Sequence, residues 1–295
     1  MALIIPATNG MHVDTKYSAI CEPNLYSNAW LVPGVTCTDK YQIGGAGQIM
    51  IHKLAHSPLT PGAPGRDFTH VAQEDAEIPI VLNNNYQTSR KLYQVALNAI
   101  SAPIAEESLA GATQDARMGM EQSGLACLYT EAGETVTAAK ATKTDIKDAI
   151  LETRGKLSKK YANGGVILAS PDAYTALMQA AGAEFTPNAN ELVRTTGRVG
   201  NYYGMIVFEV NALASGTAST YYNAAGTLVS VTAANMQKTQ FIMYDADAFS
   251  VVKSLEAFRM ADGGKDFIGA LAQVEMNVGM RLTTPERAIK VVSST

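Results

Sequence analysis

Residues 270 to 292 read ALAQVEMNVGMRLTTPERAIKVV, and the pattern of this stretch decides how the rest of the chain must fold. Apolar residues occupy every second position in its first half, at Ala272, Val274, Met276, Val278, Met280 and Leu282. Such a period of two predicts a strand with one buried face. The alternation resumes at Ile289 and Val291 after the turn-like Thr283-Thr284-Pro285. We therefore expect the chain to end inside a sheet.

The composition is that of a folded chain with many small residues. The chain has 295 residues, of which 47% are hydrophobic and 17% are charged. Because the charged share lies below the roughly 25% usual in soluble domains, many surface positions must be small or weakly polar, which suits a protein covered by other subunits. A net charge of −4 provides no broad cationic field. Specific DNA binding is therefore not expected.

Neither the cysteines nor the start of the chain indicates export. Cys21, Cys37 and Cys127 follow no Cys-x-x-Cys spacing and cannot all pair internally, which favours reduced thiols. The start, MALIIPATNG, lacks a basic region, and Pro6 interrupts its apolar run, which argues against a signal peptide. The sequence holds no apolar run of about 18 residues that could span a bilayer. We expect synthesis and first action in the cytoplasm.

The first 82 residues predict an extended arm followed by a long hairpin. Residues 1–40 show no sustained periodicity, so this arm should lie on another surface. Strand-like flanks at Gln48–His56 and Phe68–Leu82 enclose Ser57–Arg66, where three prolines and two glycines forbid regular structure. A lone two-stranded hairpin is marginal in water. It needs a partner surface, and both its own globule and a neighbouring subunit stay open.

The period then becomes helical. After the turn Asn83-Asn84-Asn85, we expect a helix over Ser89–Ile100. A second helix follows Pro103, with a stripe made of Ile104, Leu109, Ala112, Ala116 and Met120. Three glycines in this helix each cost about 1 kcal/mol against alanine, namely Gly111, Gly119 and Gly124. Tertiary or intersubunit packing must therefore hold it.

The middle of the chain predicts an α/β unit. Thr144 can cap a helix over Asp145–Tyr161, and Val166–Ala169 follows as a short buried strand. Ser170 and Pro171 then open a helix that runs to Ala181.

The remaining segments return to strands. Gly204–Val210 is strand-like, and residues 211–238 form a loop-rich edge. From Gln240 onward strands resume. Pairing of these strands with segments near residues 78–82 would build one core from both ends of the chain.

The histidines and glycines give weak signals of a ligand site. His52, His56 and His70 lie on the two flanks of the hairpin. Positions four apart in a strand are separated by about 13 Å, so surface histidines are favoured over a zinc site. Three glycines precede a strand instead of following one, unlike those of a dinucleotide site, and they therefore favour a turn: Gly197, Gly200 and Gly204.

The charged residues also favour structural roles. Asp245, Asp247 and Glu256 could act as acid and base, but such carboxylates are mostly solvated or turn-forming. Lys53 could form an isopeptide bond with an Asn of a neighbour, although nothing marks it as desolvated. A basic cluster suits the end of a helix better than a phosphate site: Arg154, Lys156, Lys159 and Lys160. We expect no catalytic, cofactor-binding or metal-binding residue.

Three stretches of the sequence, together with the closing strand, resemble those of a known protein family. They are TDIKDAILETRGKLSKKYANGGVILASPDAYTALMQ (144–179), GRVGNYYGMIVFEVN (197–211) and FIMYDADAFSVVKSLEAF (241–258), followed by MRLTTPERAIKVV (280–292). In this order they resemble the major capsid protein family of tailed double-stranded-DNA phages, whose fold also occurs in encapsulins and in the floor of herpesvirus shells. The resemblance covers nearly the whole chain, and none of its motifs is a catalytic signature.

The resemblance implies an α+β fold with four parts. These are an N-terminal arm (1–40), an extended β-hairpin loop over an adjacent subunit (41–82), a peripheral domain with a spine helix (83–135 and 239–295) and an inserted α/β axial domain (136–238). It implies a non-enzymatic subunit, without a cofactor, that assembles in the host cytoplasm into hexamers and pentamers of an icosahedral virion head. Packaged double-stranded DNA would be contacted only non-specifically, and no membrane is involved.

The resemblance also implies partners. The strand-rich hairpin starts near residue 41, which leaves no room for a long helical scaffolding region before it, so a separate scaffolding protein is expected. A portal and a candidate decoration protein complete the expected partners. Two alternatives stay open: an encapsulin-like compartment that holds a cargo enzyme, and an oligomeric α/β enzyme that uses the region of Asp245 and Asp247.

Overall fold

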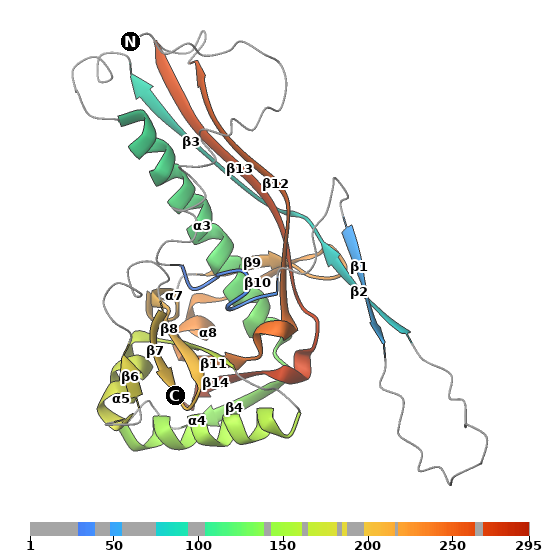
Figure 1. Ribbon diagram of the computed structural model, residues 1–295, viewed down its shortest axis with the longest axis vertical. Helices are drawn as coiled ribbons and strands as arrows, with labels where there is room; N and C mark the ends of the chain where they lie inside the picture. Colours follow the sequence, from blue (N-terminus) through green and yellow to red (C-terminus); the bar gives the residue numbers. More distant parts are fainter. Residues whose placement is uncertain are drawn as a thin grey trace, which may run out of the picture.

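The computed structural model describes residues 29–38, 48–54, 75–93, 104–138, 143–160, 165–181, 185–187, 198–215, 218–262 and 268–294. The molecule has a long stalk above a compact base, and a hairpin projects sideways from near their junction (Figure 1). The stalk consists of helix α3 (Ile104–Glu131) and a three-stranded sheet of β12 (Phe249–Asp262), β13 (Gly269–Leu282) and β3 (Asn84–Tyr93). Within the described ranges, no helix is both long and apolar enough to span a bilayer.

The stalk confirms the predicted strand of period two. β13 lies between β12 and β3, antiparallel to both. Its alternate residues from Ala270 to Leu282 are buried and form one core with the inner face of α3. The side chains between them lie on the opposite face and are mostly half-exposed. Burial of one face therefore determines the register of the central strand.

The glycines of α3 lie where bulky side chains press against the helix. A Cβ atom on Gly119 would lie 2.9 Å from the Tyr86 ring of β3, and one on Gly124 would lie 3.2 Å from the Trp30 ring. These positions need glycine because the neighbouring element approaches so closely. Tertiary packing, one of the two kinds of packing that the sequence left open, therefore holds this glycine-punctuated helix.

The base contains a seven-stranded sheet. Its strand order is β4 (Glu134–Ala138), β14 (Ala288–Ser293), β11 (Thr239–Tyr244), β5 (Val166–Ala169), β8 (Met205–Glu209), β7 (Arg198–Tyr202) and β6 (Phe185–Pro187). The closing strand β14 pairs with both β4 and β11, so the chain does end inside a sheet. Buried Ile289 and Val291 confirm the predicted alternation.

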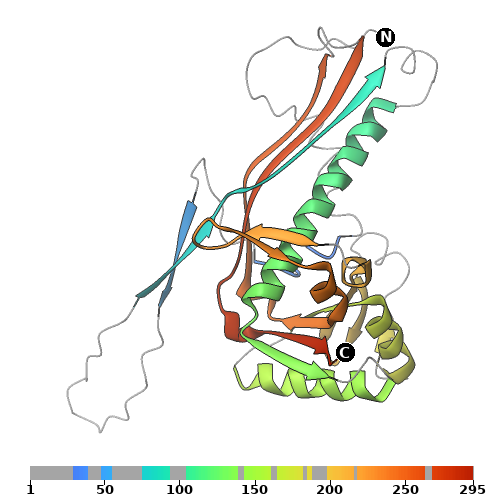
Figure 2. The same cartoon turned by 180° about the vertical axis from the view of Figure 1, so that it is seen from behind.

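Helices cover both faces of this sheet. Helices α4 (Lys143–Ser158) and α5 (Pro171–Ala181) share one buried cluster with alternate strand residues such as Ile167. The other face packs against α7 (Asn211–Ser215) and α8 (Ala233–Lys238), and it is continuous with the stalk core. A small hairpin of β9 (Ser219–Tyr222) and β10 (Leu228–Val231) lies across α3, as the view from behind shows (Figure 2).

Two expectations about residues 83–100 are wrong. Residues 89–93 belong to strand β3 and not to a helix, and Asn84 and Asn85 begin that strand instead of forming a turn. The residues of β3 that face α3 include Tyr86, Thr88 and Arg90, and this mixed chemistry hides the period of two. Residues 94–100 lie outside the described ranges. The pairing partner of β13 is therefore 84–93 and not the segment near 78–82.

Smaller differences concern boundaries and one missed region. Helix α4 begins at Lys143, so Thr144 lies inside the first turn and does not cap it, and the helix ends at Ser158. Residues 211–238, expected to be loop-rich, contain α7, β9, β10 and α8. The predicted strand Val166–Ala169 and the helix from Pro171 to Ala181 are confirmed.

The described part of the N-terminal arm lies on its own chain. Residues 29–38 make a turn whose Trp30, Leu31 and Cys37 are buried in the stalk core. The Thr38 amide donates to the Phe249 carbonyl at 2.8 Å, which places this segment beside β12. The rest of the arm, and the predicted hairpin tip at 57–66, lie outside the described ranges.

Candidate functional site: the projecting hairpin

Strands β1 (Gln48–Leu54) and β2 (Asp75–Val81) form the projecting hairpin, an antiparallel two-stranded sheet. One of its faces is made entirely of isoleucine near the root, where Ile49 pairs with Ile80 and Ile51 pairs with Ile78. Ile51 and Ile80 are buried in a small core with Leu82 and Val252. The root of the hairpin is therefore attached to the stalk by apolar packing.

Gly279 of β13 makes this attachment possible. A Cβ atom there would lie 2.8 Å from Ile80 Cγ2, 2.9 Å from Leu82 Cδ2 and 2.9 Å from the Val81 carbonyl oxygen. A glycine inside a strand often marks a close approach of another backbone. The sequence therefore held a signal for this contact, a single glycine within a well-patterned strand, but the pattern alone did not reveal what lies against it.

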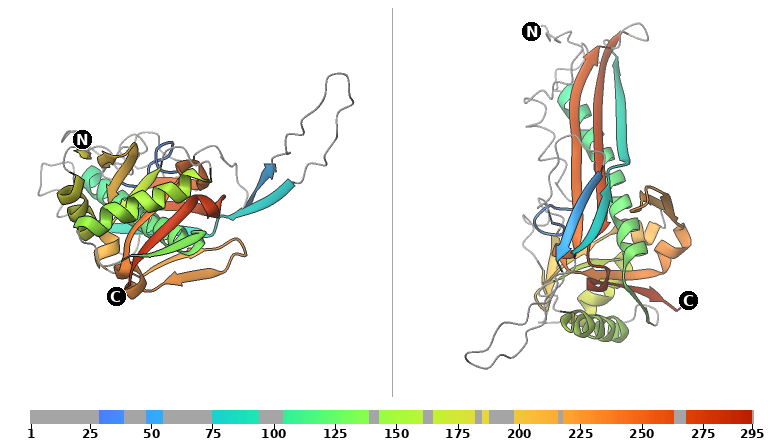
Figure 3. Two further views of the ribbon diagram at one scale, coloured as in Figure 1. Left: turned by 90° about the horizontal axis from the view of Figure 1, so that it is seen from below. Right: turned by 90° about the vertical axis from the view of Figure 1, so that its right-hand side faces the viewer.

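Away from its root the hairpin has little support. It extends away from both stalk and base in Figure 1 and in the left-hand view of Figure 3. On the face opposite the isoleucines, Met50 is 43% exposed, and His52 and Glu77 are exposed. Among the described strands, β1 and β2 pair only with each other. A two-stranded sheet of this kind is marginal in water, so a further surface is needed to stabilise it.

The stalk sheet adds two open edges. Among the described strands, β12 and β3 each pair only with β13, apart from a single bridge between Thr38 and Ser250. Unpaired edges are sites where another chain can add. At the far end of the stalk, Ile268 is 82% exposed and Tyr93 is 58% exposed.

The outer face of the stalk sheet is polar and internally bonded. Arg259 Nε donates to Gln273 Oε1 at 2.7 Å, and Gln87 Nε2 donates to Glu275 Oε1 at 2.9 Å. Asn85 Nδ2 donates to the same glutamate oxygen at 3.3 Å. These cross-strand pairs satisfy the exposed polar groups and favour a solvated face.

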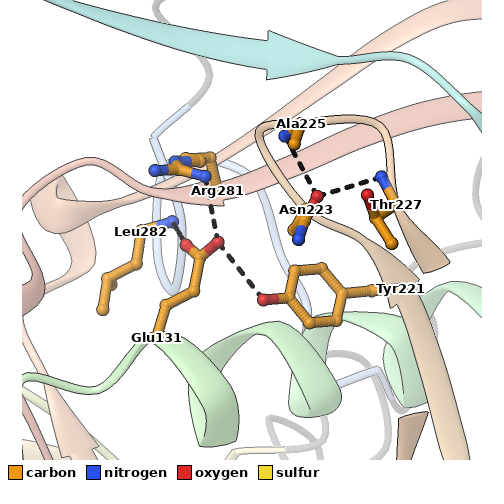
Figure 4. A network of polar contacts seen from close by, with 7 residues as sticks. All are labelled: Glu131, Tyr221, Asn223, Ala225, Thr227, Arg281 and Leu282. Carbon is orange, nitrogen blue, oxygen red and sulfur yellow. Dashed lines mark hydrogen bonds and ion pairs between the residues drawn. The ribbon is translucent and has the colours of Figure 1, made fainter. Parts of the chain in front are cut away.

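A largely buried carboxylate joins the end of α3, strand β13 and the β9–β10 hairpin (Figure 4). Glu131, the last residue of α3, accepts hydrogen bonds from the Leu282 amide at 2.9 Å, Arg281 Nη1 at 3.2 Å and Tyr221 Oη at 3.3 Å. Burial raises the pKa of Glu131, and these donors counteract the shift. Because the three donors come from β13 and β9, the end of α3 is tied to both.

A second largely buried carboxylate holds the N-terminal segment. Glu121 Oε1 of α3 accepts from the Trp30 amide at 2.9 Å. Burial raises the pKa of Glu121 to about 6, while Arg117 and the amides of Trp30 and Leu31 oppose the shift. Neither glutamate stood out in the sequence, because an acid inside a long helix gives no local signal of burial.

The histidine and glycine candidates form no ligand site in the described ranges. His52 is exposed on β1, while His56 and His70 lie outside these ranges. No group of three or more histidine, cysteine or acidic residues that could hold a metal occurs among the described residues. Gly200 lies in β7 and Gly204, with φ of +78°, forms the turn before β8, which confirms the predicted turn. Gly197 is outside the described ranges.

The acidic candidates serve as structural groups. Asp245 Oδ1 accepts from the Asp247 amide at 3.3 Å and its Oδ2 from Arg287 Nη1 at 3.3 Å, which caps a short 3₁₀ turn. Burial raises the pKa of Asp245. Asp247 is exposed, and Glu256 lies within β12 opposite Met276. This arrangement supports a turn, as the sequence favoured, and not an acid–base pair.

The remaining basic residues and the cysteines also have structural surroundings. Lys156 Nζ lies 2.7 Å from Glu134 and 3.1 Å from Glu152, and Lys160 lies 3.8 Å from Glu134. Arg154 stands over the Tyr203 ring at 5.7 Å. Cys37 and Cys127 are buried. Lys53 pairs with Ala76 in the hairpin ladder, and the surroundings of its side chain lie outside the described set.

Comparison with solved structures identifies the fold. The chain is similar to the capsid of cyanophage P-SCSP1u, with 16% identity, a TM-score of 0.65 and 90% of each chain covered. The mature capsid of bacteriophage PhiM1 matches with 16% identity and a TM-score of 0.61 over 86% of this chain and 85% of that one. A virus-like particle from Pyrococcus furiosus matches with 11% identity and a TM-score of 0.54 over 94% and 98%.

These likenesses place the chain in a class of shell-forming folds. More narrowly, it has the α+β fold of phage capsid proteins, with the projecting hairpin and long helix that the sequence predicted. No protein-family model and no curated protein sequence matches the chain. At such low identity the similarity establishes the fold alone.

Proposed function

We propose that this chain is the major capsid subunit of a tailed phage and that it self-assembles into hexamers and pentamers of an icosahedral head enclosing double-stranded DNA. The observation that carries the proposal is a hairpin whose described buried core lies at its root and whose strands project away from the body of a chain with a capsid fold. Such a hairpin gains its missing contacts from neighbouring copies.

The energetics favour assembly over a solitary subunit. Burying exposed apolar surface stabilises an association by about 25 cal/mol per Å² before the costs of binding. The hairpin exposes Met50, and the stalk tip exposes Ile268 and Tyr93. Shells join each subunit to several others, so many modest contacts of this kind add up to a stable particle.

The charge distribution suits a container for DNA. The net charge is −4, and two of the clustered lysines are paired with carboxylates. Few phosphate contacts would form on such a surface, because affinity for DNA depends on unpaired cations. We infer that packaged DNA is contacted only non-specifically.

The proposal includes partners and a location. A separate scaffolding protein would direct curvature, a portal would occupy one vertex, and a decoration protein is a further candidate. The subunit would be assembled in the host cytoplasm and remain in the virion, with no membrane partner and no cofactor. The bonded state of Asp245 supports a structural role instead of a catalytic one.

A protein compartment that holds a cargo enzyme is the second candidate. The likeness to a virus-like particle from Pyrococcus furiosus, which covers 94% of this chain, favours it specifically. The contents of the particle separate the two functions. Nuclease-protected DNA in particles from infected cells would indicate a phage head, whereas a co-purifying enzyme would indicate a compartment.

Expression of the full chain tests the proposal directly. Sedimentation velocity and negative-stain electron microscopy, with and without a co-expressed scaffolding protein, should reveal capsomers, tubes or closed shells. A monodisperse monomer under both conditions would refute the proposal. Turnover that disappears in Asp245→Asn, on any substrate, would instead support the enzyme alternative.

A further inference from the structure

The β9–β10 hairpin is small but firmly closed. The Asn223 Oδ1 atom accepts from the amides of Ala225 and Thr227, both at 3.0 Å, and so holds the turn (Figure 4). Gly226 takes φ of +70°, a conformation that favours glycine. The Gly226 amide donates to the Asn223 carbonyl at 2.9 Å, which closes the turn further. This segment is therefore a defined element and not a loose edge.

The inner side of this hairpin is attached to α3. Tyr221 is 1% exposed, and its hydroxyl donates to Glu131 at the end of the helix. At Thr220, the residue of β9 that precedes Tyr221, the carbonyl accepts a hydrogen bond from Ser123 Oγ of α3 at 2.6 Å. Since Glu131 also binds Arg281 and Leu282, the hairpin, the helix end and β13 meet at one carboxylate (Figure 4).

The other side of the same hairpin reaches the pivot, which we define as Leu82–Asn83, the connection between β2 and β3. The Tyr222 amide donates to Oδ1 of Asn84, the first residue of β3, at 3.3 Å. Asn84 is 5% exposed. A Cβ atom on Gly226 would lie 3.7 Å from Asn83 Nδ2, so the turn lies directly beside the pivot.

The pivot is thus held from two sides. On one side, Leu82 and Ile80 press against β13 at Gly279. On the other side, the β9–β10 hairpin binds Asn84 and lies close to Asn83. Only two residues separate the end of β2 from the start of β3. Little freedom remains for the direction in which the projecting hairpin leaves the body.

We propose that the β9–β10 hairpin is a strut that sets the direction of the projecting hairpin by linking the pivot to the carboxyl end of α3. Two adjacent residues make the link, because Tyr221 bonds Glu131 and Tyr222 bonds Asn84. Any displacement of the end of α3 relative to β13 is transmitted to the projecting hairpin. The purpose of this coupling, to aim the hairpin at a neighbouring copy, rests on the proposed function.

Distance measurements between two spin labels test the strut. Labels are attached at cysteines introduced in Met50→Cys on β1 and Met118→Cys on α3, both exposed positions. Cys21→Ser removes a native thiol, while Cys37 and Cys127 are buried. Labelled chains are diluted with unlabelled chains so that only distances within one molecule are recorded.

The variants Tyr221→Phe and Asn84→Ala each remove one end of the link. We expect the population of distances outside the main peak to rise about fivefold. This factor corresponds to the loss of one hydrogen bond, which stabilises the linked arrangement by about 1 kcal/mol. Tyr222→Phe is the matched control, because the Tyr222 hydroxyl has no hydrogen bond among the described residues. This control should reproduce the wild-type distribution.

An unchanged distribution of label distances in the folded Tyr221→Phe and Asn84→Ala chains would overturn the proposal that the β9–β10 hairpin is a strut. A broad distance distribution in the wild type would also overturn it. Thermal unfolding of each variant shows whether it is folded, and Tyr221→Phe preserves the ring that packs in the core. Particle formation by the wild type is scored separately by electron microscopy. A failure to form particles would refute the proposed function without deciding the strut.

Discussion

The stalk and the projecting hairpin are both long and antiparallel, but their own chain supports them very differently. In the stalk, three strands bury a continuous face against the 28-residue helix α3. The described core of the projecting hairpin consists of four buried residues at its root: Ile51, Ile80, Leu82 and Val252. The stalk therefore has an extensive core of its own, whereas the described part of the hairpin has only this small one, and we propose that neighbouring copies supply further contacts.

A folded chain can therefore contain an element that its own core supports only in part. Free energy of folding is concentrated where apolar faces meet within the chain. The root of the projecting hairpin packs against Gly279 and Val252 of the stalk, and this contact holds the hairpin in place. We propose that the exposed outer face of the hairpin, with Met50, His52 and Glu77, contributes to association instead of to folding, so that mutation can separate the two roles.

The largest expected effect comes from a change in the stalk core. Phe249 is 0% exposed and its ring lies 5.8 Å from that of Tyr244. Phe249→Ala should lower the free energy of unfolding by about 3–5 kcal/mol, because it leaves a cavity in a packed core. Urea denaturation of the isolated subunit measures this loss. The exposed aromatic change Tyr93→Ala should stay within about 0.5 kcal/mol, and a loss below that limit in Phe249→Ala would contradict the account.

A change at the hairpin root should have a smaller effect on folding and a large one on assembly. Gly279→Val places a side chain where Ile80 and Leu82 already lie, and overpacking of this kind costs about 1–3 kcal/mol. Chemical denaturation and particle yield are measured together. Gly155→Ala, where no atom lies within 4 Å of the new Cβ, is the control and should be neutral or slightly stabilising. Normal particle yield from Gly279→Val would argue against this anchorage.

The attachment of the N-terminal segment to the stalk should depend on pH. The folded-state pKa of Glu121 is raised from 4.5 to about 6, so the folded chain binds more protons than the unfolded chain between these values. Stability from this group is present below pH 4.5 and is lost as the pH rises through about 6, by about 2 kcal/mol in total.

Replacement of this carboxylate isolates its contribution. Glu121→Gln removes the titration, so the difference in unfolding free energy between variant and wild type should change across this pH window and be constant outside it. Denaturation series at closely spaced pH values measure the difference. A constant difference from pH 4 to pH 8 would show that Glu121 does not titrate as described.

The smallest effect on folding is expected on the outer face of the projecting hairpin. Met50→Asp alters a side chain that is 43% exposed, so the free energy of unfolding should change by less than about 0.5 kcal/mol. Particle yield should nevertheless fall, because a charge would enter a contact between copies. Met50→Leu is the conservative control and should assemble normally. Equal yields from both variants would show that this face makes no contact between copies.

The sequence predicted elements whose signals are local. Alternation from Ala272 to Leu282 revealed β13 because one face packs against a single helix. The Ser170-Pro171 pair marked the start of α5, since proline fits the first turn and serine accepts from the Ala173 amide. The closing strand was visible through Ile289 and Val291.

Elements that depend on distant contacts could not be predicted in the same way. The β9–β10 hairpin has the composition of a loop, and it is ordered by the contacts of Tyr221 with α3. Strand β3 was hidden because its inner face includes Arg90, whose guanidinium pairs with Asp115 of α3. The surroundings of Glu121 and Glu131 depend on segments remote in the sequence, whose amides donate to these carboxylates.

Hydrogen exchange of the same peptides in isolated subunits and in assembled particles shows whether neighbouring copies complete the projecting hairpin. Amides of β12, β13 and β3 should be protected in both states, because the stalk is stabilised by its own core. Amides of β1 and β2 should exchange rapidly in the subunit and become protected in the particle. Equal protection of the projecting hairpin in the two states would contradict the claim that neighbouring copies complete it.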